Sequence, residues 1–239
     1  MSKYEENGIE IDGLDEIEVE NTAVDDLDTE SINLIFIGID ESGSMGSYIA
    51  DMKNCLSEFK TALTESKEAD EILVARADFS DDIKIGGYKK ISEFNTSFAT
   101  YGCTAMFDTI IEGSEKLKEY RKFLKEQGMT RVKAVFAIFS DGLDNQSSHS
   151  FSEAKREVGT LDSNGKYPPE SLNSEEITTA FISFGGQATQ TAKDLGFRNI
   201  LDVASSASEL RKAFNCLSKS VIESSKSVLS DDGDDFFQV

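Results

Sequence analysis

Four short runs rich in apolar residues recur along this chain, and they restrict its fold more than any other feature. The runs cover residues 32–39, 72–79, 132–139 and 177–184. Strands that are buried on both faces have this composition, because helices cover both sides of a parallel sheet. Between the runs, apolar residues recur every three or four positions, as they do along one face of a helix. The alternation predicts an α/β domain with a mostly parallel sheet.

The remaining pattern fills in this architecture. One helical stripe covers residues 49–63, and a longer one covers residues 106–124 and is expected to stop near Gly128. Further predictions are a hairpin turning at Gly86-Gly87, a surface loop over 159–176, a helix over 188–195, a short edge strand over 199–203, and a final helix opened by a capping box of Ser206 and Glu209.

Acidic residues are concentrated at the two ends of the sequence. The whole chain has a net charge of −21, of which residues 1–30 contribute −11, with twelve Asp or Glu and one Lys. We therefore divide the sequence into an acidic, partly disordered arm (1–30), a domain (31–222) and an acidic tail (223–239). No cluster of Lys and Arg interrupts this pattern, which argues against binding to nucleic acid or to anionic membranes.

The cysteines and the apolar segments predict a cytoplasmic protein. Cys55, Cys103 and Cys216 are odd in number and widely spaced, which argues against a disulfide framework or a thiolate zinc site. The acidic N-terminal segment has no apolar core of the signal-peptide kind, and no apolar run approaches the ~18 residues that span a bilayer.

Oxygen-bearing side chains follow two of the predicted strands. Asp40, Ser42 and Ser44 come directly after the first run, and Asp141 follows the run that ends at Phe139. Ligands bind beyond the carboxyl ends of the strands in such sheets, and Mg²⁺ prefers oxygen donors. A third segment, Gly102-Cys103-Thr104-Ala105-Met106-Phe107-Asp108, opens the long helix.

These three segments resemble the von Willebrand factor A (vWA) domain family over about residues 32–222. The metal-ion-dependent adhesion site (MIDAS) of that family combines an Asp-x-Ser-x-Ser loop, a distant Thr, and an Asp in an Asp-Gly turn. The matching positions are Asp40, Ser42, Ser44, Thr104 and Asp141. The resemblance implies a Rossmann-like, three-layer α/β/α fold whose mostly parallel sheet has one antiparallel edge strand. Within the family, the chain resembles intracellular stand-alone members, which include proteins associated with tellurite resistance and stress systems and partners of AAA+ ATPases.

The resemblance also implies a ligand set and a function. Ser42 and Ser44 would bind Mg²⁺ (or Mn²⁺ or Ca²⁺) directly, and Thr104 directly or through water. Asp40 and Asp141 would act directly or through water and orient the hydroxyls. With only two carboxylates nearby, the cation keeps a position for an outside ligand, which in the family is often an Asp or Glu of a protein partner. The expected function is thus non-enzymatic, metal-dependent protein binding.

Several neighbouring residues bear on partner choice. Glu41 either adds negative potential at the ion or is a solvent-facing loop charge, and the second interpretation is favoured slightly. Asp144 and the pair Asp81-Asp82 are candidates for the same rim, and Cys103 is expected to be a small buried packing residue.

Enzymatic alternatives fit less well. Neither Ser42 nor Ser44 lies in a Gly-x-Ser-x-Gly elbow, and the sole histidine, His149, is expected to be a solvated loop or helix-start residue. A hydrolase that uses the cation to activate water against a phosphoester remains an alternative, but the matched loops offer no clear general base. A structural or assembly protein with acidic ends is another alternative. A surface adhesin is disfavoured by the absent signal and the unpaired cysteines.

The acidic ends suggest one more hypothesis. A carboxylate from either end, such as Asp234 or Asp235, is able to complete the cation's shell in the same or a neighbouring molecule, which allows self-association through the tails.

Overall fold

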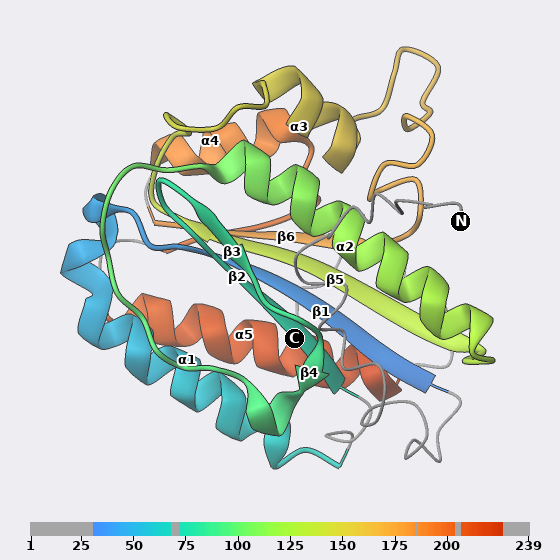
Figure 1. The fold of residues 1–239 in the computed structure, drawn as a ribbon, viewed down its shortest axis with the longest axis horizontal. Helices are drawn as coiled ribbons and strands as arrows, with labels where there is room; N and C mark the ends of the chain where they lie inside the picture. The colour runs from blue at the N-terminus through green and yellow to red at the C-terminus, as the bar shows by residue number, and fades with distance from the viewer. Residues whose placement is uncertain (1–30, 68–71, 185, 204–206, 227–239) are drawn as a thin grey trace, which may run out of the picture.

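The computed structural model describes residues 31–67, 72–184, 186–203 and 207–226, and these form a three-layer α/β/α domain (Figure 1). The strands are β1 (Ser31–Asp40), β2 (Ile72–Phe79), β3 (Ile83–Ile85), β4 (Lys89–Lys90), β5 (Arg131–Ser140), β6 (Thr178–Ser183) and β7 (Asn199–Asp202). The α-helices are α1 (Ile49–Thr64), α2 (Met106–Glu126), α3 (Phe151–Val158), α4 (Gly186–Leu195) and α5 (Ala207–Lys226), and the 3-10 helices are η1 (Gly43–Tyr48) and η3 (Ile91–Glu93).

The sheet is mostly parallel, as predicted, with the strand order β3-β2-β1-β5-β6-β7. Strands β2, β1, β5, β6 and β7 run parallel, and only β3 and β4 pair antiparallel to β2. The central pair has Ile39 beside Phe139, so the chain leaves β1 and β5 at neighbouring points of one sheet edge. This register brings the residues after both strands together.

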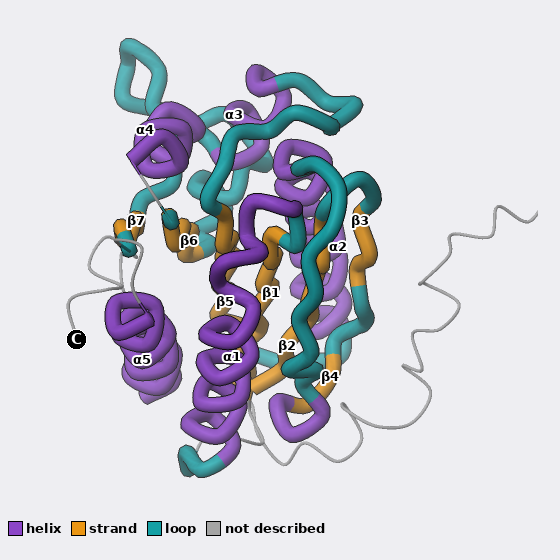
Figure 2. The backbone as a smooth tube through the Cα atoms, turned by 90° about the vertical axis from the view of Figure 1, so that its left-hand side faces the viewer, coloured by secondary structure: helices purple, strands orange, loops and turns teal. Residues whose placement is uncertain are grey.

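Helices cover the two faces of the sheet, as Figures 1 and 2 show from two directions. Helices α1 and α5 bury their apolar stripes against one face, where Phe59, Phe139 and Phe214 meet. Helices α2, α3 and α4 cover the other face around Phe36 and Phe136, whose rings stack with centroids 5.0 Å apart. No helix among the described residues combines the length and apolar character needed to cross a membrane.

Gly113 allows α2 to lie close to β1. A Cβ atom at this position would lie 2.3 Å from the ring of Phe36, which is closer than packed atoms approach. The helix that begins just after Thr104 is thus fixed against the strand that ends at Asp40.

The predicted hairpin at Gly86-Gly87 is wrong. Segments β3 and β4 do not pair with each other; both pair with β2, and the N–H of Gly86 donates to the carbonyl of Arg76 at 2.8 Å. Neither glycine has a positive φ, so the backbone does not form the primed turn that the pair suggested. Together β3 and β4 form one edge of the sheet, interrupted at Gly86-Gly87. The turn that reverses the chain lies between β2 and β3, where the Ser80 N–H donates to the carbonyl of Asp82.

Other differences are local. Helix α3 was not predicted, although Ser150 and Glu153 form a capping box at its start. The 159–176 segment has no helix or strand but buries Leu172 completely, so it is partly a core element. Helix α5 continues to Lys226, four residues past the expected domain end. Both acidic ends, 1–30 and 227–239, and the capping box expected at Ser206 and Glu209 lie outside the described residues or side chains.

Candidate metal centre

The first loop of the centre is built around Asp40, the last residue of β1. Its side chain is fully buried, and its Oδ1 accepts a 2.8 Å hydrogen bond from the backbone N–H of Ser42. Its Oδ2 accepts a 2.6 Å bond from Ser140 Oγ, at the end of β5. The carboxylate therefore fixes the turn after β1 and ties it to the neighbouring strand.

A chain of hydroxyls links this turn to Asp141. The Ser42 and Ser44 Oγ atoms lie 3.0 Å apart, and Ser44 Oγ donates to Asp141 Oδ1 at 2.8 Å. Because Ser44 uses its proton on the carboxylate, Ser42 is the donor of the other bond. Each of the two hydroxyl oxygens then keeps at least one lone pair for a cation, and the chain of donated protons ends on the Asp141 carboxylate.

Thr104 approaches the same place from the third segment. Its side chain is 4% exposed, and its Oγ1 lies 4.0 Å from where a Cβ on Gly142 would stand. Its backbone N–H donates to Asn145 Oδ1 at 2.8 Å, and its carbonyl accepts from the N–H groups of Asn145 and Gln146. The loop after β5 thus holds both Asp141 and the backbone of Thr104.

The five side chains form a gradient from core to solvent. Asp40, Ser42 and Thr104 are buried, Asp141 is half-buried and Ser44 is exposed. A cation among them would be enclosed on the protein side and open on the other. Two cavities of about 370 and 670 Å³ lie elsewhere, beside β2 and between α1 and α5, and none of the five residues lines either of them.

The electrostatics of the site favour a cation. Burial raises the pKa of Asp40 to about 6, against hydrogen bonds from Ser140 and Ser42 that lower it, and burial also raises the pKa of Asp141. Among the described residues no basic side chain forms an ion pair with either carboxylate. Two buried or half-buried acids without a cationic partner, joined to three hydroxyls, fit a small oxygen-loving cation.

No cluster of three or more His, Cys, Asp or Glu side chains among the described residues is placed to hold a metal. The candidate centre has a different composition, because two carboxylates and three hydroxyls supply its oxygens. Such a set leaves a divalent cation with little charge compensation from the protein.

Glu41 does not face solvent, contrary to the interpretation favoured from the sequence. Its Oε1 lies 3.4 Å from Arg76 Nη2, with the two side chains 12% and 7% exposed, and it accepts from the N–H of Ala99 at 3.1 Å. Arg76 also pairs with Asp78 at 2.6 Å. Glu41 thus binds Arg76 and the 95–99 segment, and Arg76 compensates part of its charge.

The other neighbours support the loops. Asp81 accepts from the N–H of Cys103 at 2.7 Å, which helps to place the segment before Thr104. Cys103 itself is exposed, so the expectation of a buried packing residue is wrong. Gly102, with φ of +69°, makes the turn, and its carbonyl accepts from the N–H of Gly43 at 3.1 Å.

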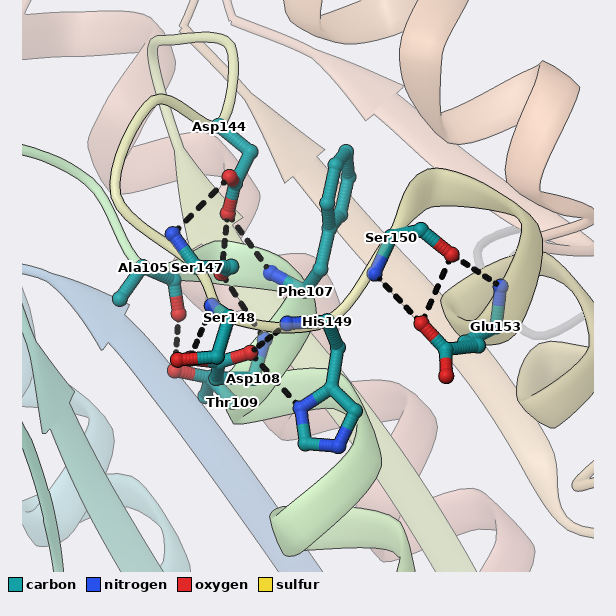
Figure 3. Close-up of polar contacts among 10 residues, drawn as sticks. All are labelled: Ala105, Phe107, Asp108, Thr109, Asp144, Ser147, Ser148, His149, Ser150 and Glu153. Carbon is teal, nitrogen blue, oxygen red and sulfur yellow. Dashed lines mark hydrogen bonds and ion pairs between the residues drawn. The ribbon is translucent and has the colours of Figure 1, made fainter.

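A polar network braces the start of α2, as Figure 3 shows. Asp144 accepts from the N–H of Phe107 at 2.9 Å, and Ser147 Oγ accepts from the N–H of Asp108 at 3.0 Å. In return Asp108 accepts from the N–H groups of Ser148 and His149 and from His149 Nδ1, each at 2.8 Å. The Asp144 oxygens are therefore engaged at the start of a helix, and His149 serves the same brace.

Sequence reasoning missed two residues that hold the centre. Ser140 anchors Asp40, and Asn145 anchors Thr104. Ser140 directly follows the apolar stretch 134–139, which was a usable signal, because a buried hydroxyl there needs a partner. The sequence carries no comparable signal for Asn145, since its partner is the backbone of a segment 41 residues away.

Solved structures show the same fold. The pilus adhesin SpaC of Lactobacillus rhamnosus GG, in its open conformation, superposes with a TM-score of 0.59 at 14% identity over 83% of this chain and 31% of its own. A von Willebrand factor type A protein of Catenulispora acidiphila gives 0.56 at 13% identity over 80% of this chain and 43% of its own. Proximal thread matrix protein 1 of the mussel byssus, with a zinc-occupied MIDAS motif, superposes with a TM-score of 0.55 at 15% identity, over 80% of this chain and 46% of its own.

These similarities establish a vWA-like fold. The chain spans less than half the length of each of these three proteins. No protein-family model matches the sequence, and no curated protein matches it either.

Proposed function

We propose that this protein is a metal-dependent protein-binding domain. Asp40, Ser42, Ser44, Thr104 and Asp141 would hold one divalent cation, Mg²⁺ or a similar ion such as Mn²⁺ or Ca²⁺. An Asp or Glu of a protein partner would complete its coordination. The single observation that carries the proposal is the hydrogen-bonded chain from Ser42 through Ser44 to Asp141, beside the buried Asp40.

The chemistry of the donors supports this reading. The hydroxyl oxygens offer lone pairs and Asp141 accepts the Ser44 proton, as in a shell where neutral ligands bind directly and acids orient them. A bound cation would supply electrophilic character toward a carboxylate. The adhesin and vWA neighbours, and the zinc-occupied site of one of them, are consistent with an adhesive use of the fold.

The compensated charge of Glu41 also supports an acidic partner. An unpaired acid next to the ion would repel a second carboxylate, and the ion pair with Arg76, which Glu41 shares with Asp78, offsets part of that repulsion. We further propose that the domain works without catalysis and in the cytoplasm. The matched loops place no unengaged general base beside the hydroxyls, since His149 is bound to Asp108 on the brace.

Water proton relaxation with Mn²⁺ tests the open position. Bound Mn²⁺ that keeps exchangeable water should enhance relaxation, and a glutamate-containing peptide should lower that enhancement by displacing the water. Asp40→Asn should remove the part of the enhancement that comes from the tight site, together with its response to the peptide, and Asp194→Asn, an exposed acid on α4, should change neither. An enhancement that the peptide leaves unchanged would contradict the acceptor role. Metal-dependent turnover of phosphoesters lost in Asp40→Asn would favour the hydrolase.

A further inference from the structure

Two large apolar side chains are exposed on the loops that supply the candidate ligands. Tyr101 is 41% exposed and lies three residues before Thr104, and Leu143 is 48% exposed and lies two residues after Asp141. Only one other large hydrophobic side chain among the described residues is as exposed. Exposed apolar groups that border a polar site are typical of an interaction surface.

These two side chains lie on opposite sides of the 40–44 loop. Tyr101 stacks under the Lys84 ammonium of β3, 5.6 Å from the ring centroid, and its N–H donates to the carbonyl of Glu41 at 2.7 Å. Leu143 follows β5. Strand β1 lies between β5 and the β2–β3 side of the sheet, so the two apolar groups flank the metal loop. We call the surface formed by Tyr101, Leu143 and the 40–44 loop the rim.

The rim selects for a particular chemistry. A cation neutralising Asp40 and Asp141 favours a carboxylate, and Lys84 adds a positive charge beside Tyr101. The exposed ring and the leucine favour bulky apolar groups next to that carboxylate. A segment in which acids adjoin aromatic residues satisfies both requirements.

The chain itself contains such a segment. Residues 231–237 read Asp-Asp-Gly-Asp-Asp-Phe-Phe, so Asp234 and Asp235 directly precede Phe236 and Phe237. Resting on the function proposed above, we propose that this segment of one molecule docks on the rim of a second copy. An aspartate there would ligate the cation, and a phenylalanine would pack on Tyr101 or Leu143.

The geometry of α5 favours the second copy over the same molecule. Helix α5 starts near the end of β7, at the edge that carries the metal loops, and runs to the opposite side of the domain (Figure 1). Its 20 residues cover about 30 Å at 1.5 Å per residue. The nine residues from 227 to 235 span at most about 30 Å when fully extended. Asp235 would reach the metal site of its own molecule only if residues 227–235 were fully extended. Docking on a second copy does not require this extension.

Such docking joins two different surfaces of the same protein. The contact is heterologous, so it extends into open chains unless the rotation between copies closes a ring. The repulsion between copies with a net charge of −21 opposes it, and the cation removes the negative charge of Asp40 and Asp141 at the rim. Association should therefore depend on the metal.

Sedimentation velocity on the full chain tests the proposal. In saturating Mg²⁺ the sedimentation coefficient should rise with protein concentration, and excess EDTA should reverse the rise. The double variants Asp234→Asn/Asp235→Asn and Phe236→Ala/Phe237→Ala should both stay monomeric. Asp25→Asn/Asp26→Asn removes the same charge from the other end and should associate like the wild type. A wild type that stays monomeric in Mg²⁺, association that persists in EDTA, or loss of association in the N-terminal variant would each overturn the proposal.

A peptide of residues 229–237 measures the rim directly. Its affinity for the Mg²⁺-loaded Asp234→Asn/Asp235→Asn chain should fall about tenfold in Tyr101→Ala or Leu143→Ala, as expected for removing one apolar contact. Leu161→Ala, a matched exposed leucine away from the site, should leave it unchanged. Equal binding in all three rim and control variants would overturn the docking surface. Cation binding is measured separately, so a chain that binds Mg²⁺ but not the peptide refutes only the docking, and one that binds no cation refutes the proposed function.

Discussion

Ser44 Oγ donates a 2.8 Å hydrogen bond to Asp141 Oδ1, across 97 residues of sequence. This bond joins the loop after β1 to the loop after β5, which the sheet register sets side by side. It also fixes which oxygen lone pairs remain for a cation. Hydrogen bonds of the protein itself therefore hold Ser42, Ser44 and Asp141 of the proposed centre together.

Removing the Ser44 hydroxyl should weaken the cation site without unfolding the domain. Ser44 is exposed, so Ser44→Ala is expected to change the free energy of unfolding by less than about 1 kcal/mol. Affinity for Mn²⁺ should fall at least about tenfold, because one ligand and the anchor of Asp141 are lost together. Calorimetric titration checks this, with Ser57→Ala on the exposed face of α1 as the matched control. Equal affinities in the two variants would exclude Ser44 as a ligand.

The buried charge of Asp40 should destabilise the metal-free domain above about pH 6. Burial raises the pKa of Asp40 to about 6, so the folded state holds the proton more tightly than the unfolded state. Stability from this group is present below about pH 4 and is lost as the pH rises to about 6. Asp40→Asn should thus be more stable than the wild type in EDTA at neutral pH, by on the order of 2–3 kcal/mol.

Urea unfolding at several pH values measures this difference. The advantage of Asp40→Asn should shrink to near zero at acidic pH, and saturating Mg²⁺ should stabilise only the wild type. An Asp40→Asn variant that is less stable than the wild type at neutral pH in EDTA would show that the buried Asp40 charge does not destabilise the domain.

Loss of the Ser140 hydroxyl should lower the stability of the domain more than its cation affinity, because Ser140 anchors Asp40 but is not itself a proposed ligand. Ser140→Ala leaves the buried Asp40 Oδ2 without its 2.6 Å donor, at a cost of about 1–3 kcal/mol. Cation affinity should fall only a few-fold, because the five ligands remain. Thermal unfolding and Mn²⁺ titration separate the two effects, and Ser140→Thr, which keeps a hydroxyl, should restore much of the stability. A Ser140→Ala variant as stable as the wild type would contradict the anchor role.

The brace at the start of α2 should weaken in acid. Burial alone would raise the pKa of Asp108, but the N–H groups of His149 and Ser148 and the His149 ring together lower it. Its stabilisation is therefore present above about pH 4 and lost as the pH falls further. Asp108→Asn should cost about 1–2 kcal/mol at neutral pH, and the difference from wild type should narrow below pH 4. Denaturant unfolding at neutral and acidic pH measures the difference in unfolding free energy between Asp108→Asn and the wild type. A difference that does not change with pH would show that the Asp108 charge does not hold the 148–149 segment.

The sequence predicts the sheet and the position of the site better than it predicts the contacts around them. Apolar runs such as 132–139 define buried strands because every residue in them needs cover, and the residues after β1 and β5 must then share one edge. The hairpin predicted at Gly86-Gly87 is wrong because two glycines permit a turn without requiring one. The pairing of both flanking segments with β2 decides the conformation of the glycines.

The roles of Glu41 and Ser140 depend on distant partners. Arg76 stands 35 residues from Glu41, and Asp40 stands 100 residues from Ser140, so no local pattern reveals either pairing. Helix α3 is a different case, since the Ser150 and Glu153 capping box is visible in the sequence and was overlooked.

Calorimetric titration of Mn²⁺ into the chelator-treated full chain tests the central claim most directly. Every variant carries the same acidic ends, so any weak cation binding there is common to all of them, and the comparison is between the wild type and Asp141→Ala, which differ only at the centre. The account predicts one additional tight site per chain in the wild type, present in Asp194→Asn and absent in Asp141→Ala. Identical isotherms for the wild type and Asp141→Ala would contradict it.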